Sequence, residues 1–209
     1  MPQSISWSFT DRQDSQAFPI TCYHHLVSSV AGCHLQALRA AVGSRREVRD
    51  MSLFRQVLGL LLLVLVCFAV AGIGSFVTTP SIADWYAGLR KPEWTPPAWL
   101  FGPVWTVLYL SMAVAAWLVW RRVGLSGAAV PLAVFGMQLA LNLVWSIIFF
   151  GLNNIGLALV DIVLLWLAIV ATIFAFRHVS VLAGWLLVPY LIWVTFAAAL
   201  NLSIWSMNR

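Results

Sequence analysis

The sequence predicts an all-α integral membrane protein, a bundle of five transmembrane helices with a long, ordered, Pro/Trp-rich first loop. Composition is the first reason. The 209 residues are 62% hydrophobic and 9% charged, whereas a soluble domain is about 45–50% apolar and about 25% charged. Charge distribution is the second, because nine of the 19 charged residues lie in the first fifty positions. The remainder is so apolar that lipid must be part of its solvent.

Residues 1–50 form a basic leader, rich in Ser, Gln, His and Arg. Three interpretations are open: a disordered segment, an amphipathic targeting segment around Leu26 to Val42, or translation that begins at Met51. The net charge is +5, to which residues 1–50 contribute +1, and the basic residues are not gathered on one folded polar surface, so we expect no nucleic-acid partner. Its Cys and His spacing matches no standard zinc or haem pattern, so we expect no metal site.

Five apolar runs follow in the predicted membrane domain, residues 51–209. Each is close to the roughly 20 residues that cross a hydrocarbon core about 30 Å thick, and each is bounded by polar or turn residues. Segments that span lipid must be helical, because lipid offers the backbone no hydrogen bonds. The predicted helices cover residues 53–77, 99–120, 130–150, 155–176 and 181–206.

The positions of Lys and Arg predict the orientation. The connections on the amino-terminal side contain Arg55, Arg121, Arg122 and Arg177, in addition to the basic leader. The other side contains Arg90, Lys91 and Arg209. We therefore expect a multi-pass membrane protein with its amino terminus in the cytoplasm and its carboxyl terminus outside.

The predicted first loop, residues 78–98, combines rigid and aromatic residues. Three prolines between Pro92 and Pro97 fix φ and disfavour helix. The large rings are Trp85, Tyr86 and Trp94, with Trp99 just beyond. Such rings favour either an aromatic belt at the membrane interface or a lid that closes over a cavity between helices.

Three predicted helices carry aromatic and amide residues on one face, at helical spacing. The sets are Trp105, Tyr109 and Met112; Gln138, Asn142, Trp145 and Phe149; and Tyr190, Trp193, Ala197 and Asn201. These faces favour either a flat apolar pocket with few hydrogen-bonding groups or core packing in which amides join helices. Asp161 lies well inside a span, where a charge costs about 2.5–3.5 kcal/mol, so we expect it to face protein.

Five motifs in a fixed order carry a resemblance to a known family. They are Trp85-Tyr86, Lys91-Pro92-x-Trp94-x-Pro96-Pro97, Phe101-Gly102-Pro103-x-Trp105, Asn142-x-x-Trp145 and Pro189-Tyr190-x-x-Trp193. Over residues 53–206 the chain resembles the tryptophan-rich sensory proteins, relatives of the mitochondrial translocator protein or peripheral benzodiazepine receptor. The resemblance implies a five-helix membrane protein, usually a dimer, that binds porphyrins and related hydrophobic ligands under the first loop.

The motifs and the helix faces together give a candidate ligand site. Its residues are Tyr86, Trp94, Pro96, Trp105, Asn142, Trp145, Tyr190, Trp193 and Asn201. Porphyrin, of the protoporphyrin or haem-like type, is the expected ligand, with no required cofactor and with Arg90 or Lys91 as a charged rim. The resemblance also implies a sterol-binding motif in animal members, in which a Tyr is followed within five residues by Lys or Arg. This chain departs from that motif, because Tyr190 is followed by Leu-Ile-Trp-Val-Thr. We therefore do not expect sterol recognition through it.

Three functions compete. The first is a binding or sensory protein for porphyrin-type tetrapyrroles, acting in tetrapyrrole metabolism or its regulation. The second, implied by the resemblance for some bacterial relatives, is a slow porphyrin-degrading enzyme that uses Trp105 and Trp193; we expect no other catalytic residue. The third is a small-solute or porphyrin transporter, against which an odd number of spans without an internal repeat argues.

The third predicted helix carries small residues at spacings of four, three and four. They are Ala129, Ala133, Gly136 and Ala140. Small residues let two helix backbones approach closely within lipid, where packing drives association. We therefore expect a homodimer contact along this stripe.

Overall fold

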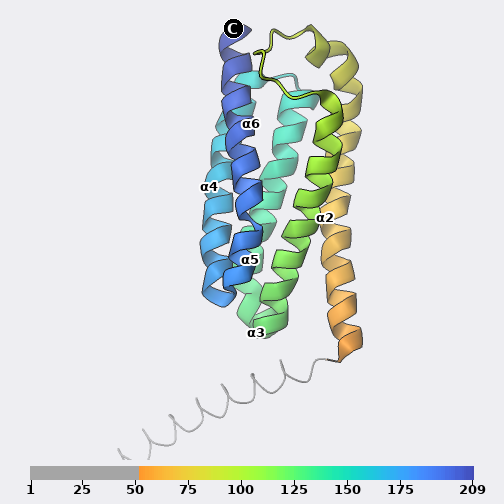
Figure 1. Cartoon of the computed structure of the whole chain (residues 1–209), viewed down its shortest axis with the longest axis vertical. Helices are drawn as coiled ribbons and strands as arrows, with labels where there is room; N and C mark the ends of the chain where they lie inside the picture. The colour runs from red at the N-terminus through yellow and green to blue at the C-terminus, as the bar shows by residue number, and fades with distance from the viewer. Residues whose placement is uncertain (1–51) are drawn as a thin grey trace, which may run out of the picture. The chain divides into compact units, whose positions relative to one another are not determined.

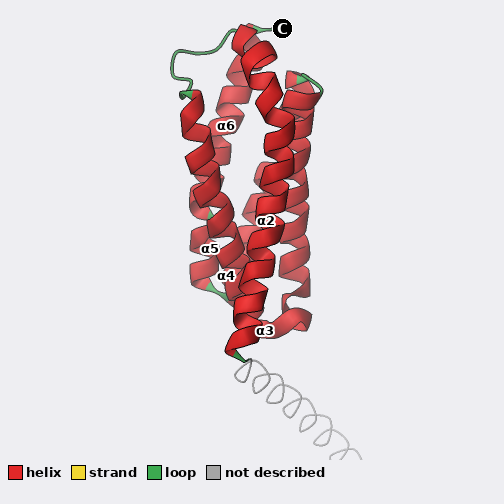
Figure 2. Ribbon diagram, turned by 90° about the vertical axis from the view of Figure 1, so that its right-hand side faces the viewer, coloured by secondary structure: helices red, strands yellow, loops and turns green. Residues whose placement is uncertain are grey.

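The computed structural model describes residues 52–209, which form an elongated bundle of helices without strands (Figure 1, Figure 2). The α-helices are α2 (Leu53–Ser81), α3 (Phe101–Ser146), α4 (Ile155–Val179), α5 (Val181–Leu186) and α6 (Val188–Met207). Short turns of other helical types are η1 (Ile82–Tyr86), η2 (Ala98–Leu100) and η3 (Ile147–Gly151), of which η1 and η3 are π-helical. The predictions for the leader and for Met51 lie outside the described residues.

Four helical segments of this described part are long and apolar enough to cross a membrane. They are Leu53–Tyr86, Ala98–Gly151, Ile155–Val179 and Val181–Met207. The sequence predicted five separate runs, and the difference arises in α3.

The second and third predicted runs both lie in α3, which reverses direction at Gly124 (Figure 1). Gly124 has a φ of 67° and a ψ of −176°, a conformation that glycine adopts without a steric penalty. Tyr109 and Asn142 are 33 positions apart, yet their side chains are hydrogen-bonded. A straight helix, rising about 1.5 Å per residue, would keep them far apart. We call the two parts of α3 its first part, residues 101–123, and its second part, residues 125–146.

The boundary predicted at the start of the first loop was wrong. Helical conformation continues through Pro80 and the π turn η1 to Gly88. Pro80 cannot donate to the preceding turn, and the wider π turn that follows lets the backbone resume its bonding pattern. The non-helical connection between α2 and α3 is therefore residues 89–97 rather than residues 78–98.

The last predicted run is divided into α5 and α6 at Leu187. Pro189 stands in the first turn of α6, where a missing backbone N–H leaves no helical bond unmade. The chain between α4 and α5 turns tightly, since a Cβ added to Gly184 would lie 2.0 Å from Cγ of Arg177. Glycine at this position lets the two helices meet.

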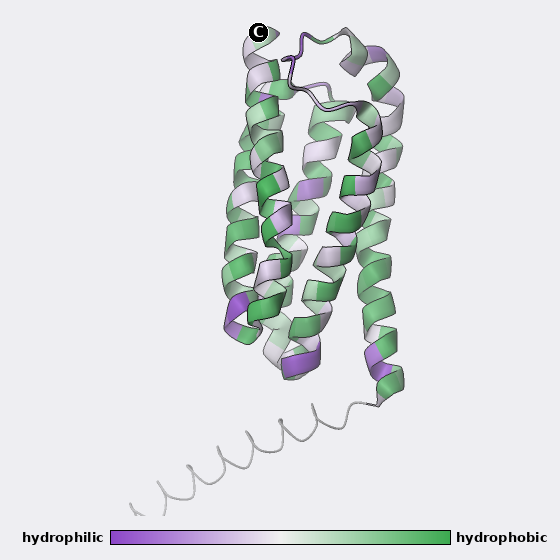
Figure 3. Ribbon diagram, viewed as in Figure 1, coloured by the Kyte–Doolittle hydropathy of each residue, from purple (hydrophilic) through white to green (hydrophobic). Residues whose placement is uncertain are grey.

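The outer faces of the helices are apolar over most of their length, and polar residues gather near the ends of the bundle (Figure 3). Phe76 on α2 is 83% exposed and Phe54 is 75% exposed, as expected for side chains that contact lipid rather than water. At the end opposite the 89–97 connection, Arg122 donates to the Val179 carbonyl at 3.1 Å. Asp161 is buried, as predicted.

Candidate functional site

A cavity of about 490 Å³ lies near the end of the bundle where α2 is connected to α3. It is bordered by α2, both parts of α3, α4 and α6. Pockets for drug-sized molecules have volumes of about 300–1,000 Å³ and are lined mainly by apolar and aromatic groups with a few polar ones. The cavity therefore has the size and the lining of a small-molecule site.

Six of the nine predicted site residues line this cavity. They are Tyr86, Trp105, Asn142, Trp145, Trp193 and Asn201. Tyr190 is fully buried behind the cavity wall, and Pro96 lies in the 89–97 connection, which contributes no lining residue. Trp94 is half exposed and its ring packs on Phe196 of α6, with centroids 5.6 Å apart. Of the loop rings Trp85, Tyr86 and Trp94, from which the sequence suggested a lid, Tyr86 alone lines the cavity.

One side of the cavity is a cluster of rings that we call the first wall: Tyr86, Trp145, Phe149 and Phe150. Trp145 stacks on Phe149 with centroids 5.1 Å apart and planes 23° apart. Phe150 contacts Phe149 at 4.8 Å and Tyr86 at 5.8 Å. The π turns η1 and η3 supply three of the four rings, and Ser81, directly before η1, donates to the Phe150 carbonyl in η3 at 2.7 Å. The two π turns thereby bring rings from α2 and α3 together.

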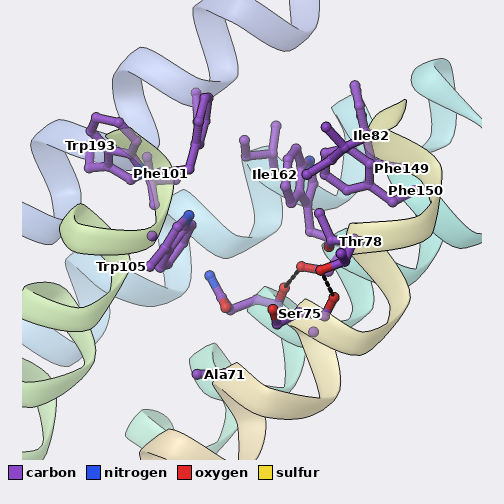
Figure 4. A pocket seen from close by; sticks show the side chains of 18 of the residues that line it. Ala71, Ser75, Thr78, Ile82, Phe101, Trp105, Phe149, Phe150, Ile162 and Trp193 are labelled. Atoms are coloured by element: carbon purple, nitrogen blue, oxygen red, sulfur yellow. Dashed lines mark hydrogen bonds between the residues drawn. The ribbon is translucent and has the colours of Figure 1, made fainter. Parts of the chain in front are cut away.

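The opposite side is a second wall, formed by Phe101, Trp105 and Trp193. Phe101 meets Trp193 edge to face, with centroids 5.8 Å apart. Trp105 is backed by Tyr109 at 5.5 Å and by Tyr190 at 6.2 Å. Figure 4 shows the second wall facing Ile82, Phe149 and Phe150 across the cavity. The cavity is therefore a space between two aromatic surfaces.

Polar groups beside the walls are bonded mainly to one another. Tyr109 donates its hydroxyl hydrogen to Oδ1 of Asn142, and Nδ2 of Asn142 donates to the Tyr190 hydroxyl at 3.1 Å. The indole of Trp145 donates to Oδ1 of Asn201 at 3.2 Å, and Nδ2 of Asn201 donates to the Ile155 carbonyl. The two asparagines therefore join helices, as the core-packing interpretation expected, while they also line the cavity.

The predicted charged rim is not found at the cavity. Nζ of Lys91 donates to the backbone carbonyls of Tyr86, Ala87 and Leu89, at 2.6–3.2 Å. This side chain satisfies carbonyls that the end of the helix leaves free. Neither Lys91 nor Arg90 lines the cavity, and every lining side chain contributed by the described residues is uncharged.

Sequence reasoning missed the contribution of α2 and α4. Ala71, Ser75 and Thr78 of α2 and Ile82 at the start of η1 line the cavity at spacings of four, three and four, which places them on one helix face (Figure 4). Ile162 and Leu165 of α4 also line the cavity. The small and hydroxyl residues of α2 were a usable signal, but they stand in a helix whose other faces are equally apolar.

Apolar helices of membrane-spanning length around a neutral aromatic cavity define a helical membrane protein with an internal small-molecule-sized site. The TspO/MBR family model matches residues 63–206. This chain belongs to the TspO/MBR family, which confirms the resemblance carried by its motifs.

Curated relatives agree with this assignment. The tryptophan-rich protein TspO of Archaeoglobus fulgidus is 44% identical over 152 residues, covering 73% of this chain and 98% of the relative. The translocator protein of Homo sapiens is 48% identical over 127 residues, covering 60% of this chain and 75% of the relative. The tryptophan-rich sensory protein of Cereibacter sphaeroides is 39% identical over 142 residues, covering 66% and 88% respectively.

Proposed function

We propose that this protein binds porphyrin-type tetrapyrroles and similar flat hydrophobic ligands within the membrane, in tetrapyrrole metabolism or its regulation. One observation carries the proposal: two aromatic walls face each other across a cavity of about 490 Å³. Stacked aromatic pairs contribute about 0.5–1.5 kcal/mol each beyond the burial of area. A planar macrocycle between the walls would form such pairs on both of its faces.

The absence of charge among the described lining residues determines how a porphyrin would be oriented. Its carboxylates lie at one edge of the ring, and burying an unpaired carboxylate is costly. The bound macrocycle would therefore lie with its carboxylate edge toward the bundle end that holds Arg90 and Arg209. The proposed binding requires no cofactor.

The proposed membrane topology has five crossings. The reversal at Gly124 lets α3 supply two of them, while α2, α4 and the pair α5 and α6 supply one each. The distribution of basic residues supports an amino terminus in the cytoplasm of a bacterial cell and a carboxyl terminus outside.

A homodimer through the second part of α3 is part of the proposal. The predicted small-residue stripe is exposed at all four positions, Ala129, Ala133, Gly136 and Ala140. A Cβ added at Gly136 would meet no described atom within 4 Å. A second copy of the chain could therefore approach this surface closely.

Porphyrin degradation is the second candidate function. The observation that favours it is that Trp105 and Trp193, both oxidisable indoles, stand in the same wall of the cavity. A ligand bound against that wall would contact both indoles directly.

The deciding experiment mixes the purified protein with protoporphyrin in detergent and follows the Soret band. A saturable shift without bleaching is the expected result. Light- or oxygen-dependent loss of the band with turnover would favour the enzyme, and an unchanged spectrum would contradict porphyrin binding.

A further inference from the structure

The 89–97 connection is held against the end of the bundle at several points. Asn208, just after α6, accepts a hydrogen bond from the Arg90 amide at 3.0 Å and donates to the Arg90 carbonyl at 2.9 Å. Lys91 is bonded to three backbone carbonyls at the end of the preceding helical turns. Trp94 packs on Phe196 of α6. These contacts hold the connection in place at the polar end of the bundle.

The side of the cavity between α2 and the first part of α3 is bordered by small residues instead. Gly72 on α2 and Gly102 on α3 both line the cavity. A Cβ added at either glycine would meet no described atom within 4 Å. Thr106, one turn beyond Gly102, also lines the cavity, and all three residues are exposed.

These residues continue into the outer surface of the bundle. Gly72 is four positions from Phe76, which is 83% exposed, and Gly102 and Thr106 share an i, i+4 row with Leu110, which is 48% exposed. Both rows lie within the segments that are apolar enough to cross a membrane. Exposed residues therefore run from the cavity lining to a lipid-facing surface on α2 and on the first part of α3.

We propose that ligands enter and leave the cavity laterally from the bilayer, through the gap between Gly72 on α2 and Gly102 with Thr106 on α3. The 89–97 connection stays in place while they pass. The route is uncharged, so it selects molecules that partition into the membrane before they bind. The identity of the porphyrin ligand in the first test below rests on the proposed function.

The first test narrows the gap and measures the rates of ligand association and dissociation. Gly72→Leu and Gly102→Leu place side chains in open space, and leucine favours helix over glycine. In liposomes, stopped-flow quenching of tryptophan by protoporphyrin should show association and dissociation slowed by a similar factor, about tenfold in the double variant. The dissociation rate is the deciding readout, because a narrower gate raises the barrier in both directions and slows dissociation, whereas lost contacts with the ligand would speed it.

Two control variants separate the routes. Gly88→Leu makes the same substitution in open space near the connection, and Asn208→Ala releases the connection from α6; neither should alter the rates. Faster association in Asn208→Ala together with normal rates in the double variant would overturn lateral entry. A parent protein that fails to bind protoporphyrin would contradict the proposed function instead.

The second test needs no porphyrin. Liposomes contain a phosphatidylcholine with a photoreactive diazirine in the middle of one acyl chain, and labelled residues are located by mass spectrometry. The carbene should label Trp105 or Tyr109 inside the cavity of the parent protein, and this label should be lost in the double variant. Labelling confined to outward residues such as Phe76 would overturn the proposal.

Discussion

The hydroxyl of Tyr109 in the first part of α3 donates a hydrogen bond to Oδ1 of Asn142 in the second part. The same amide donates from Nδ2 to the Tyr190 hydroxyl of α6 at 3.1 Å. All three side chains are buried. One asparagine therefore joins three helical segments directly beneath the aromatic cavity.

Replacing this asparagine should loosen the bundle. Asn142→Leu leaves the hydroxyls of Tyr109 and Tyr190 without their shared partner, and intramembrane hydrogen bonds contribute about 0.6 kcal/mol each on average. We expect a lower Tm in detergent, measured by differential scanning fluorimetry. Tyr190→Phe, which removes one of the two bonds, should lower the Tm less. Equal Tm values for Asn142→Leu and the parent would contradict this role.

The close packing of α2 against α3 should depend on Gly59. A Cβ added there would lie 2.2 Å from Cζ3 of Trp120, whereas one added at Gly72 would meet no described atom within 4 Å. Gly59→Ala should therefore lower the Tm because the helices must move apart. Gly72→Ala, the matched control, should leave the Tm unchanged or raise it slightly, since alanine is the better helix former. An equal effect of the two substitutions would refute the close contact.

Lys91 should act on the connection and not on the ligand. Lys91→Met removes three hydrogen bonds to backbone carbonyls, so hydrogen exchange over residues 89–97 should become faster while the affinity for protoporphyrin stays unchanged. Arg55→Met is the control, because Arg55 is exposed at the start of α2, at the opposite end of the bundle. A selective loss of affinity in Lys91→Met would restore the charged rim that the sequence predicted.

The small-residue stripe should determine the oligomeric state. Gly136→Leu adds a bulky side chain to an exposed position on the second part of α3, where a partner helix would need close approach. We expect a shift from dimer toward monomer in light scattering after size-exclusion chromatography. Gly88→Leu should leave the mass unchanged. A dimer that persists in Gly136→Leu would place the contact elsewhere.

Helical periodicity predicted much of the cavity but little of the backbone that shapes it. Trp105, Asn142 and Trp193 could be placed on inward faces because aromatic and amide residues recur there every three or four positions. The inward face of α2 was not predicted, because most of that helix is apolar on every side and its small and hydroxyl residues give only a weak contrast between faces. Its Ser75 and Thr78 line the cavity nevertheless.

The ends and turns were harder for a physical reason. Pro80 usually marks a helix end, and only the π turn after it lets α2 continue. The reversal at Gly124 depends on a positive φ. The glycine allows this conformation, but nothing else in the sequence indicates it. Lys91 was expected at a ligand rim. The backbone carbonyls that it bonds come within reach of its side chain only once the preceding helical turns have formed.

The measurement that tests the central claim most directly is a tryptophan-fluorescence titration with protoporphyrin of the parent, Trp105→Ala, Trp193→Ala and Trp99→Ala. Trp105 and Trp193 line the cavity, whereas Trp99 is 72% exposed and does not. Losing stacking and contact area should weaken binding about tenfold or more for each wall variant, with the affinity of Trp99→Ala close to that of the parent. The same affinity in all four proteins would contradict a binding site between the two aromatic walls.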